Sequence, residues 1–322
     1  MLPTLIPQQT TVEVRPRSDR VVLLRSSAAA MPEVEAHIDE LMPRHDWSDY
    51  VLGVVDVLRR RGHEVRGFDA AVRSSVPVGA GLSSSAALAV ATARALRQAF
   101  RLALDDREAA LIAHEAEDRF VGAHVGLMDQ LVCSLGREGE ALFVDTRDLS
   151  TRRVPLGRLD IDLVVIDSGI RHDHATGGYN TRRQECEEAA RSLGVSSLRD
   201  LAPDADLRRL PDAQRRRVRH VVSENARVLR AIDSIESGDA EELGTILCAG
   251  HASLRDDFEV SLPQIDRLAE RAQADADVYG ARLTGGGFGG CVLALAKRGA
   301  AREVAERIAA AAGGGARVVV PG

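Results

Sequence analysis

The pattern of apolar and polar positions divides this 322-residue chain into two halves of different character. In the first half, short alternating stretches typical of strands are mixed with stretches in which apolar residues recur every three or four positions, as in helices. Beyond residue 158 the chain is richer in arginine and mainly helical. The pattern predicts an α/β protein with one domain over residues 1–158 and a second over residues 159–322.

The first half is predicted to begin with a hairpin. Alternating residues at 11–14 and 21–24 flank the turn Pro16-Arg17-Ser18-Asp19, an arrangement typical of two paired strands. Apolar residues at helical spacing and further alternating stretches predict the other elements. These are helices over 47–61, 84–100 and 106–120, a strand over 68–76, and a second hairpin from 141–145 to 151–154.

The second half is predicted to contain several long helices and a few strands. The strands are expected at 159–166, 291–296 and 316–320, and the helices at 180–193, 212–236, 239–252, 261–275 and 301–312. A glycine cluster over residues 284–290 precedes the strand at 291–296. The only tight basic run, Arg215-Arg216-Arg217, falls in the helix at 212–236, and we expect it to form a solvated helix face.

One stretch rich in glycine and serine leads into the helix predicted at 84–100. It reads Pro77-Val78-Gly79-Ala80-Gly81-Leu82-Ser83-Ser84-Ser85-Ala86-Ala87. A helix N-terminus presents unpaired N–H groups and a positive dipole end, so it binds anions such as phosphate readily. Glycines allow the backbone to approach a phosphate, and hydroxyls supply donors or a metal ligand. The alternative is a serine-rich cap on a core helix, although three consecutive serines exceed what a cap needs.

Acidic and histidine residues give weaker signals. Asp129 ends a largely apolar loop with glycines and begins another predicted helix, where an aspartate is commonly a helix cap. The helix at 106–120 carries several carboxylates, most of which we expect to be solvated. His172 and His174 have a spacing possible for metal ligands, but no neighbouring cysteine or histidine cluster completes a site. We therefore expect them to be surface histidines.

Composition excludes several classes of protein. A net charge of −6 gives nucleic-acid binding no support, and no apolar run reaches the ~18 residues that a membrane span needs. The four cysteines are scattered without a Cys-x-x-Cys pair, which argues against zinc and against a disulfide framework. No Gly-x-Ser-x-Gly nucleophile turn is present. We expect a cytoplasmic protein.

Lysine usage narrows the ways in which the chain could bind a nucleoside triphosphate. Lys297 is the only lysine among the 42 basic residues. A Walker-type phosphate loop needs a lysine directly after its last glycine, and protein kinases need one on a strand. Lys297 lies in neither context, so nucleotide binding here would not use a phosphate-loop lysine.

Several motifs, in order and over essentially the whole chain, resemble the GHMP small-molecule kinases. The stretch 77–87 is similar to their second motif and 281–291 to their third. Other motifs narrow the resemblance to the galactokinases. These are Trp47-x-x-Tyr50, Gly126-Leu127-Met128-Asp129-Gln130, Gly178-Tyr179-Asn180-x-Arg182-Arg183, Glu185-Cys186-Glu187-Glu188 and Ser253-Leu254-x-Asp256-Asp257-Phe258-x-Val260-Ser261.

The resemblance implies a fold and an activity. The fold is the two-domain α+β fold of the GHMP kinases, with a ribosomal-S5-like N-terminal domain and a ferredoxin-like C-terminal domain. The activity is ATP-dependent phosphorylation of D-galactose at its C1 hydroxyl, a step of galactose metabolism. The resemblance also implies Mg²⁺ as cofactor and ATP and galactose as small-molecule partners, and we expect a monomer.

The resemblance also implies site residues. The ATP phosphates would be bound by the backbone of Gly79, Ala80, Gly81, Leu82, Ser83, Ser84 and Ser85, with the glycines of 285–290 completing the wall. Ser85 and Glu117 would hold Mg²⁺, and Asp129 would be the catalytic base facing the C1 hydroxyl. Tyr179 would hydrogen-bond the sugar, and Gly126 would let it approach closely. Trp47 would lie near the adenine, with a core tryptophan as the alternative.

One family motif has no counterpart in the sequence. The family's first motif, Gly-Arg-x-Asn-x-x-Gly-Glu-His-x-Asp-Tyr, should precede a segment like Leu2-Pro3-Thr4-Leu5-Ile6, and no Glu-His-x-Asp occurs here. In the family it carries an arginine near the transferred phosphate and side chains that bind galactose hydroxyls. We expect a misplaced start at Met1, with a truncated pseudoenzyme and a decayed gene product as alternatives. Without the motif, catalysis by the chain as given would be impaired.

Two other functions remain open at this point. A related sugar 1-kinase, acting on N-acetylgalactosamine or arabinose, would share every motif that the chain retains. A non-catalytic nucleotide-binding regulator would retain the phosphate loop without turnover. A substrate panel and an ATP-binding measurement would separate these alternatives.

Overall fold

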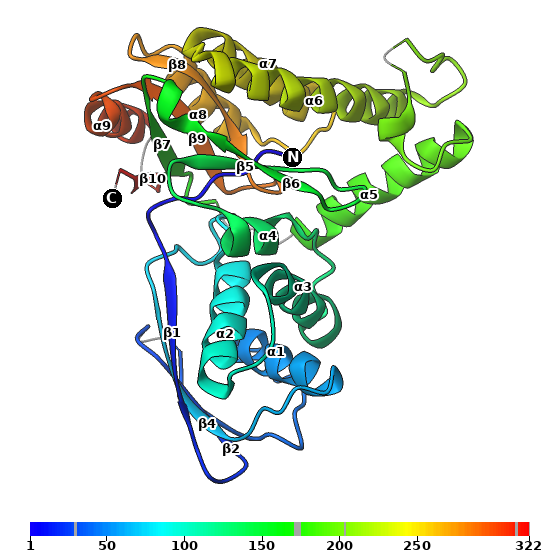
Figure 1. Cartoon of the computed structure of the whole chain (residues 1–322). Helices are drawn as coiled ribbons and strands as arrows, with labels where there is room; N and C mark the ends of the chain where they lie inside the picture. The colour runs from blue at the N-terminus through cyan, green and yellow to red at the C-terminus, as the bar shows by residue number, and fades with distance from the viewer. Residues whose placement is uncertain (29–30, 171–174, 203, 313–314, 322) are drawn as a thin grey trace. The chain divides into compact units, whose positions relative to one another are not determined.

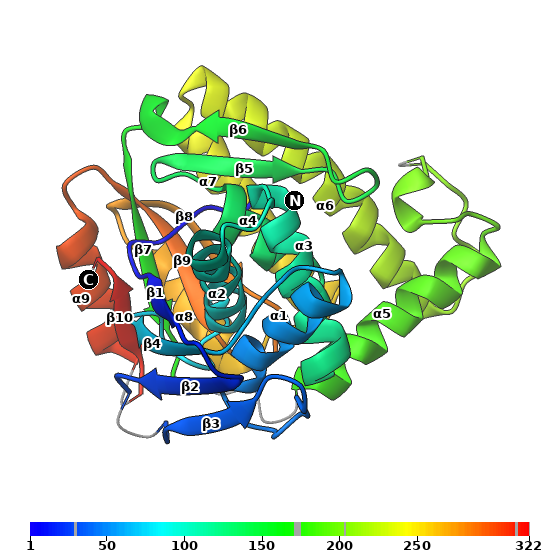
Figure 2. The same ribbon diagram turned by 60° about the horizontal axis from the view of Figure 1, so that its bottom comes forward.

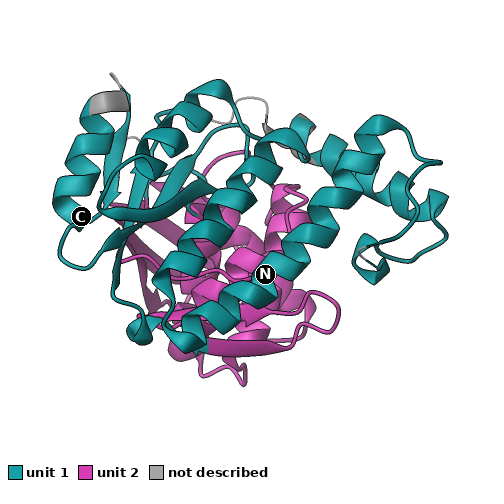
Figure 3. Cartoon of the chain, turned by 90° about the horizontal axis from the view of Figure 1, so that it is seen from above, with its two compact units in different colours: residues 1, 77–82, 154–322 teal, residues 2–76, 83–153 magenta. Residues whose placement is uncertain are grey.

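The computed structural model describes residues 1–28, 31–170, 175–202, 204–312 and 315–321 (Figure 1). Contacts between residues group the chain into two compact units (Figure 3). The N-terminal unit comprises residues 2–76 and 83–153, and the C-terminal unit comprises residue 1 together with 77–82 and 154–322. The predicted domain boundary near residue 158 stays a prediction.

The N-terminal unit contains a four-stranded sheet in the order β1-β4-β2-β3. Its strands are β1 (Thr10–Pro16), β2 (Val21–Ser26), β3 (Val34–His37) and β4 (Phe68–Ser74). The hairpin predicted from β1 and β2 is wrong, because β4 lies between them, antiparallel to β1 and parallel to β2. The residues of the supposed hairpin turn instead bond to the start of β4, with Arg17 N–H donating to the Gly67 carbonyl at 2.8 Å. Figure 2 shows β2 beside β3, a strand that the sequence did not predict.

Helices of the N-terminal unit pack on one face of this sheet (Figure 1). They are α1 (Asp49–Arg60), α2 (Ser84–Phe100) and α3 (Asp106–Ala116), whereas α4 (Met128–Leu135) buries its apolar residues in a separate cluster with the strand at 140–144. Alternate residues of β2 and β4 are buried, so apolar side chains of the sheet meet apolar stripes of the helices in one core. Predicted helix boundaries agree closely, and the predicted second hairpin is confirmed by the two-stranded sheet of β5 (Glu140–Val144) and β6 (Thr151–Pro155).

The helix predicted over 106–120 differs from the structure at its end. The α-helix stops at Ala116, and the chain continues as a short π-helix, η1 (Glu117–Val121). The start of α3 has a capping box, in which Asp105 and Glu108 each accept a backbone N–H of the other. A π-helical turn is uncommon and is frequently found at functional sites. Here it begins at Glu117, a candidate site residue.

The C-terminal unit is built on a second four-stranded sheet, in the order β10-β7-β9-β8. The strands are β7 (Ile161–Asp167), β8 (Val278–Thr284), β9 (Cys291–Lys297) and β10 (Arg317–Val320). All neighbouring pairs are antiparallel. With helices between β7 and β8 and between β9 and β10, this is the βαββαβ arrangement of ferredoxin-like folds. The fold expected for the C-terminal domain is confirmed.

Five helices accompany this sheet in the described part of the unit. They are α5 (Ala175–Ser192), α6 (Asp212–Ser237), α7 (Ala240–Asp256), α8 (Pro263–Gln273) and α9 (Ala301–Ala312), with short 3₁₀ turns η2 (Leu156–Arg158) and η3 (Leu198–Asp200). Apolar residues of β7, β8, β9, α8 and α9 form one buried cluster, and α5, η3 and α6 form another. Among the described residues, no helix is both long and apolar enough to cross a membrane.

Helix α5 starts earlier than predicted, at Ala175 rather than at residue 180, and continues through Gly177 and Gly178. Glycine disfavours helix interiors, but tertiary packing can override that preference. A Cβ atom on Gly178 would lie 2.6 Å from the ring of Phe288, so the absence of a side chain is what lets the helix pack there. The start of α5 therefore packs against Phe288, a residue of the glycine cluster at 284–290.

Candidate active site

The glycine and serine stretch forms an open backbone cradle. Positive φ angles recur at every second residue, at 72° for Gly79, 71° for Gly81 and 60° for Ser83. Alternation of this kind turns successive N–H groups toward one concave side, an arrangement that binds anions. Ser83 occupies the N-cap position of α2, but its side chain makes no capping hydrogen bond. The simple reading of these serines as a side-chain cap is therefore wrong for Ser83.

The second glycine cluster lies against this cradle within the C-terminal unit. Gly285, Gly287, Gly289 and Gly290 all have positive φ angles. A Cβ atom on Gly285 would lie 3.0 Å from the Gly81 carbonyl oxygen, and the buried thiol of Cys291 donates to the Ala80 carbonyl at 3.2 Å. Two glycine loops far apart in the sequence thus have their backbones side by side. Any side chain at Gly285 would push them apart.

Glu117 is a buried carboxylate in the N-terminal unit, with 2% of its surface exposed. Gln130, on α4, donates from Nε2 to Glu117 Oε1 at 3.0 Å, and the hydroxyl of Ser85 also bonds to this carboxylate. Burial raises the pKa of Glu117, and the hydrogen bonds from Gln130 and Ser85 offset this only in part. The carboxylate is therefore poorly compensated and would gain from a bound cation.

The oxygen atoms around Glu117 suit a hard divalent cation. Ser85 supplies a hydroxyl, Glu117 a carboxylate, and the Oε1 atom of Gln130 is buried without a hydrogen-bond partner. Hard cations such as Mg²⁺ take oxygen ligands and are commonly held by one or two carboxylates plus substrate phosphates. Among the described residues, no group of three or more His, Cys, Asp or Glu side chains could hold a metal alone. These residues fit a metal shared with a phosphate ligand.

Asp129 lies in the first turn of α4, where Leu127 is the N-cap. The interpretation of Asp129 as a helix cap is therefore wrong. Instead, its carboxylate accepts a hydrogen bond from the Ser83 hydroxyl. Burial raises the pKa of Asp129, and the bond from Ser83 lowers it to a smaller extent. The result is a carboxylate that is more basic than an exposed aspartate.

Neighbouring residues that sequence reasoning did not assign also belong to this region. Gln130 holds Glu117, and the pKa of Tyr50 is raised by burial and by the charge of Glu117. Both residues occur in the motifs noted above, which was the available signal. Burial and the charges of Asp129 and Glu117 raise the pKa of Cys133 to about 12, so its thiol stays protonated and is a poor nucleophile.

The remaining predicted residues are less closely connected to these groups. Trp47 packs against the core of the N-terminal unit, and its indole N–H donates to the Pro32 carbonyl at 3.2 Å, an arrangement that fits the core alternative. Gly126 lies exposed in the loop between η1 and α4. Tyr179 is on α5, but its side chain lies outside the described part of the structure, as do His172 and His174. Lys297 ends β9 and donates to the Ala276 carbonyl.

Comparison with known families agrees with the fold and with the glycine loops. Residues 49–137 match the GHMP kinases N terminal domain, and residues 231–314 match the GHMP kinases C terminal domain. A mevalonate kinase structure shares the fold, with a TM-score of 0.65 at 17% identity over 96% of this chain and 87% of that one. The class of protein that fold and site define is a GHMP kinase.

More similar relatives narrow the class. The chain is 45% identical to the galactokinase of Roseiflexus sp. (strain RS-1) over 308 residues, which cover 92% of this chain and 78% of that protein. It is 43% identical to the galactokinase of Streptomyces coelicolor over 304 residues, with the same coverages of 92% and 78%. The crystal structure of Lactococcus lactis galactokinase complexed with galactose matches with a TM-score of 0.93 and 31% identity, over 98% of this chain and 86% of that one. The chain belongs to the galactokinase family.

Proposed function

We propose that this protein transfers the γ-phosphoryl group of ATP to the C1 hydroxyl of galactose, forming galactose 1-phosphate. The observation that carries the proposal is the pair of carboxylates with raised pKa values, Glu117 and Asp129, each bonded to a serine of the stretch that opens α2. Ser85 bonds one and Ser83 the other, so the predicted phosphate loop and both acidic groups form one connected set. Family membership supplies the substrate class, ATP and a sugar.

The two glycine loops are suited to holding the nucleotide phosphates. Backbone N–H groups of residues 79–85 would bind phosphate oxygens, and the cluster at 285–290 would form the adjoining wall. Mg²⁺, held by Ser85 and Glu117, would supply positive charge at the phosphates that other kinases obtain in part from a lysine. Because phosphoryl transfer depends mainly on alignment and on charge stabilisation, backbone cradles fixed by packing are appropriate for it.

Asp129 would act as the general base. A base works best when its pKa lies close to the working pH, and burial moves the pKa of Asp129 in that direction. The Ser83 hydroxyl would fix the orientation of the carboxylate until the C1 hydroxyl of the sugar gives up its proton. Tyr179 and Gly126 remain predicted sugar contacts, and the cytoplasmic location and monomeric state remain predictions as well.

The test is the rate of galactose-dependent ADP formation from ATP by the chain preceded by the family's first motif, and by the Asp129→Asn variant of that extended chain. We expect kcat to fall by about 10²–10⁴-fold, the usual contribution of a general base. Asp118→Asn is the matched control, because Asp118 is an exposed carboxylate that pairs with His124. A variant at Asp129 that retains activity within a few-fold contradicts the assigned role.

Substrate choice is tested by the same assay with a panel of sugars. Galactose should give the highest kcat/KM, ahead of N-acetylgalactosamine and arabinose. If either of the other sugars gives a higher kcat/KM than galactose, the proposed substrate is wrong. If the protein binds ATP but phosphorylates none of the sugars, the proposed activity is wrong. No observation in the structure favours either of those alternatives.

A further inference from the structure

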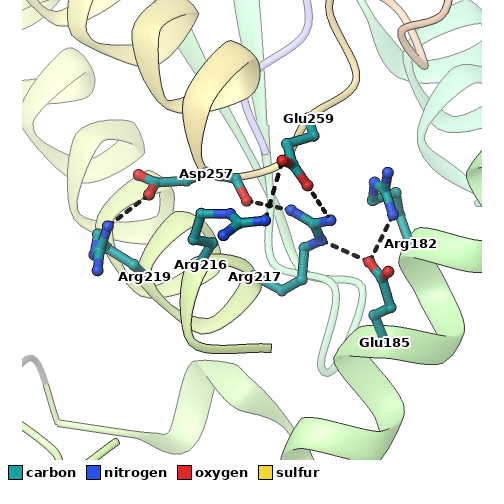
Figure 4. Close-up of polar contacts among 7 residues, drawn as sticks. All are labelled: Arg182, Glu185, Arg216, Arg217, Arg219, Asp257 and Glu259. Carbon is teal, nitrogen blue, oxygen red and sulfur yellow. Dashed lines mark hydrogen bonds and ion pairs between the residues drawn. The ribbon is translucent and has the colours of Figure 1, made fainter. Parts of the chain in front are cut away.

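Arg217 is almost completely buried in the C-terminal unit, although it belongs to a basic run that the sequence predicted to be solvated. Only 1% of its surface is exposed. Its guanidinium donates from Nε to Glu185 at 2.6 Å, from Nη1 to the Asp257 carbonyl at 2.6 Å, and from Nη2 to Glu259 at 2.6 Å (Figure 4). We call this set the arginine clamp. The prediction of a solvated face is wrong for Arg217 because acceptors from two other segments surround it.

The first arm of the arginine clamp is the bond from Arg217 to Glu259, and it leads to the second glycine loop, residues 284–290. Glu259 has a left-handed backbone conformation, with φ at 54°, which is strained for a residue other than glycine. The next residue, Val260, accepts a hydrogen bond from the Phe288 N–H at 2.7 Å. A Cβ atom on Gly287 would lie 2.5 Å from the Val260 Cβ. The glycine loop thus rests directly on the residue that follows Glu259.

The second arm is the bond from Arg217 to Glu185, and it leads to the start of α5. Glu185 lies two helical turns after Gly178, on the same helix. Gly178 packs directly on the ring of Phe288, a residue of the glycine loop. Tyr179, the predicted sugar contact, follows Gly178 in the sequence. Glu259 and Glu185 therefore connect Arg217 to two segments that meet at Phe288.

We propose that Arg217 is a positioning residue, which sets the glycine loop at 285–290 through Glu259 and the start of α5 through Glu185. This inference rests on the proposed function, because it takes the loop as a nucleotide contact and α5 as a sugar contact. In this role Arg217 needs no contact with either substrate, because its guanidinium is taken up by Glu185, the Asp257 carbonyl and Glu259. It acts by fixing the relative placement of two segments of the same unit, so that the loop and the helix are correctly spaced before substrates bind.

Arginine is required at this position for a geometric reason. A guanidinium carries donors on three nitrogen atoms in a rigid plane, and here each nitrogen serves a different acceptor. Lysine would keep the charge but could not reach all three acceptors in that geometry. The neighbours add outer support, since Arg182 also donates to Glu185 and Arg216 to Glu259. The bonds from Arg217 and Arg182 lower the pKa of Glu185 despite its burial, so it stays charged.

The first experiment compares Arg217→Lys with Arg219→Lys. Arg219 is two residues along the same helix and pairs with Asp257, but its side chain is 62% exposed, so it is a matched control. We expect Arg217→Lys to raise the KM values for ATP and for galactose by about tenfold each, the effect of losing one charge-assisted hydrogen bond. Amide hydrogen exchange should also accelerate at 175–182 and 284–290. Normal KM values and normal exchange at both segments, with only a lower Tm, would overturn the proposal.

The second experiment separates the two arms and does not depend on Arg217→Lys folding well. Glu259→Gln should raise the KM for ATP more than the KM for galactose, and Glu185→Gln should do the reverse. If Glu259 and Glu185 had only a structural role, the two variants would lower stability without affecting the KM values for ATP and galactose in this opposite way. Equal effects of the two variants on both KM values would therefore count against the arginine clamp, as would no effect of either.

A failure of the proposed function can be distinguished from a failure of this inference. If the chain preceded by the family's first motif does not phosphorylate galactose, the proposed function is refuted. ADP affinity, measured by calorimetry, and hydrogen exchange at 284–290 still test the Glu259 arm, because neither needs turnover. Weaker ADP binding and faster exchange in Glu259→Gln support the arm, and unchanged values of both overturn it.

Discussion

The carboxylates around the serine stretch and those of the arginine clamp differ in whether their hydrogen bonds outweigh the effect of burial on the pKa. Burial raises the pKa values of Glu117 and Asp129, and the hydrogen bonds they accept do not restore the ordinary values. In the arginine clamp, hydrogen bonds from arginines outweigh burial, and the pKa values of Glu185 and Glu259 are lowered. A poorly compensated carboxylate can still take up a cation or a proton, whereas a compensated one serves to fix geometry.

The largest expected effect that tests this comparison is the loss of activity in Glu117→Gln. Without the carboxylate, Mg²⁺ at the phosphates is held poorly, and kcat should fall by about 10²–10³-fold. The free energy of unfolding should rise, because a poorly compensated buried charge is removed. Steady-state kinetics and urea denaturation at pH 7 measure both quantities. Glu115→Gln serves as the control. Glu115 pairs with Arg61 and with Arg119, which lies one helical turn further along the chain.

Replacing the cation of the arginine clamp should have the opposite effect on stability. Arg217→Met leaves the Asp257 carbonyl without its donor and reduces the partners of Glu185 and Glu259 to Arg182 and Arg216, so the free energy of unfolding should fall by about 3 kcal/mol. Urea denaturation measures this loss, and Arg219→Met should stay within about 0.5 kcal/mol of the unaltered chain because that side chain is exposed. If Arg217→Met were as stable as the control, the contrast between the two regions would disappear.

A smaller effect is expected at Gln130, which donates to Glu117 and whose Oε1 atom is among the oxygens that suit the cation. Gln130→Leu removes the hydrogen bond to Glu117 and should raise the Mg²⁺ concentration for half-maximal activity by about 10–100-fold, as for other groups that orient metal ligands. The KM for galactose should hardly change. A Mg²⁺ requirement identical to that of the unaltered chain would show that Gln130 does not orient Glu117.

The smallest effect concerns pH. Asp129 is active as a base only when deprotonated, so with its raised pKa the activity should fall, as pH decreases, at a higher pH than for an ordinary aspartate. Glu185 and Glu259 have lowered pKa values, so their contribution to stability is present above their unfolded pKa values and is lost only as pH falls through the lower folded values. The stability difference between the unaltered chain and Glu259→Gln should therefore persist at pH values where kcat has already declined. Parallel pH series of kcat and of urea denaturation measure the two transitions, and their coincidence would contradict the comparison.

Much of the local structure could be predicted from the sequence. Helix α2 has the predicted bounds, 84–100, and α9 has the predicted bounds, 301–312, because amphipathic periodicity and local boundary signals act within a few residues. The glycine loops were also recognisable, since only glycine readily adopts the positive φ angles found at residues such as 79 and 285. The pairing of β1 with β4 was not recognisable, because sequence neighbours make the simpler hairpin equally plausible.

The candidate site shows the same division. The residue types of the site and its phosphate loop could be predicted from the sequence. That prediction used the backbone conformations that glycine permits and a family resemblance, which the family comparison confirms. Only tertiary structure decided which groups meet: Ser83 with Asp129, Gly81 with Gly285, and Arg217 with acceptors from α5 and the segment after α7. The physical reason is that φ preferences and apolar periodicity act along the chain. Burial, hydrogen-bond partners and pKa shifts depend on residues that are distant in sequence.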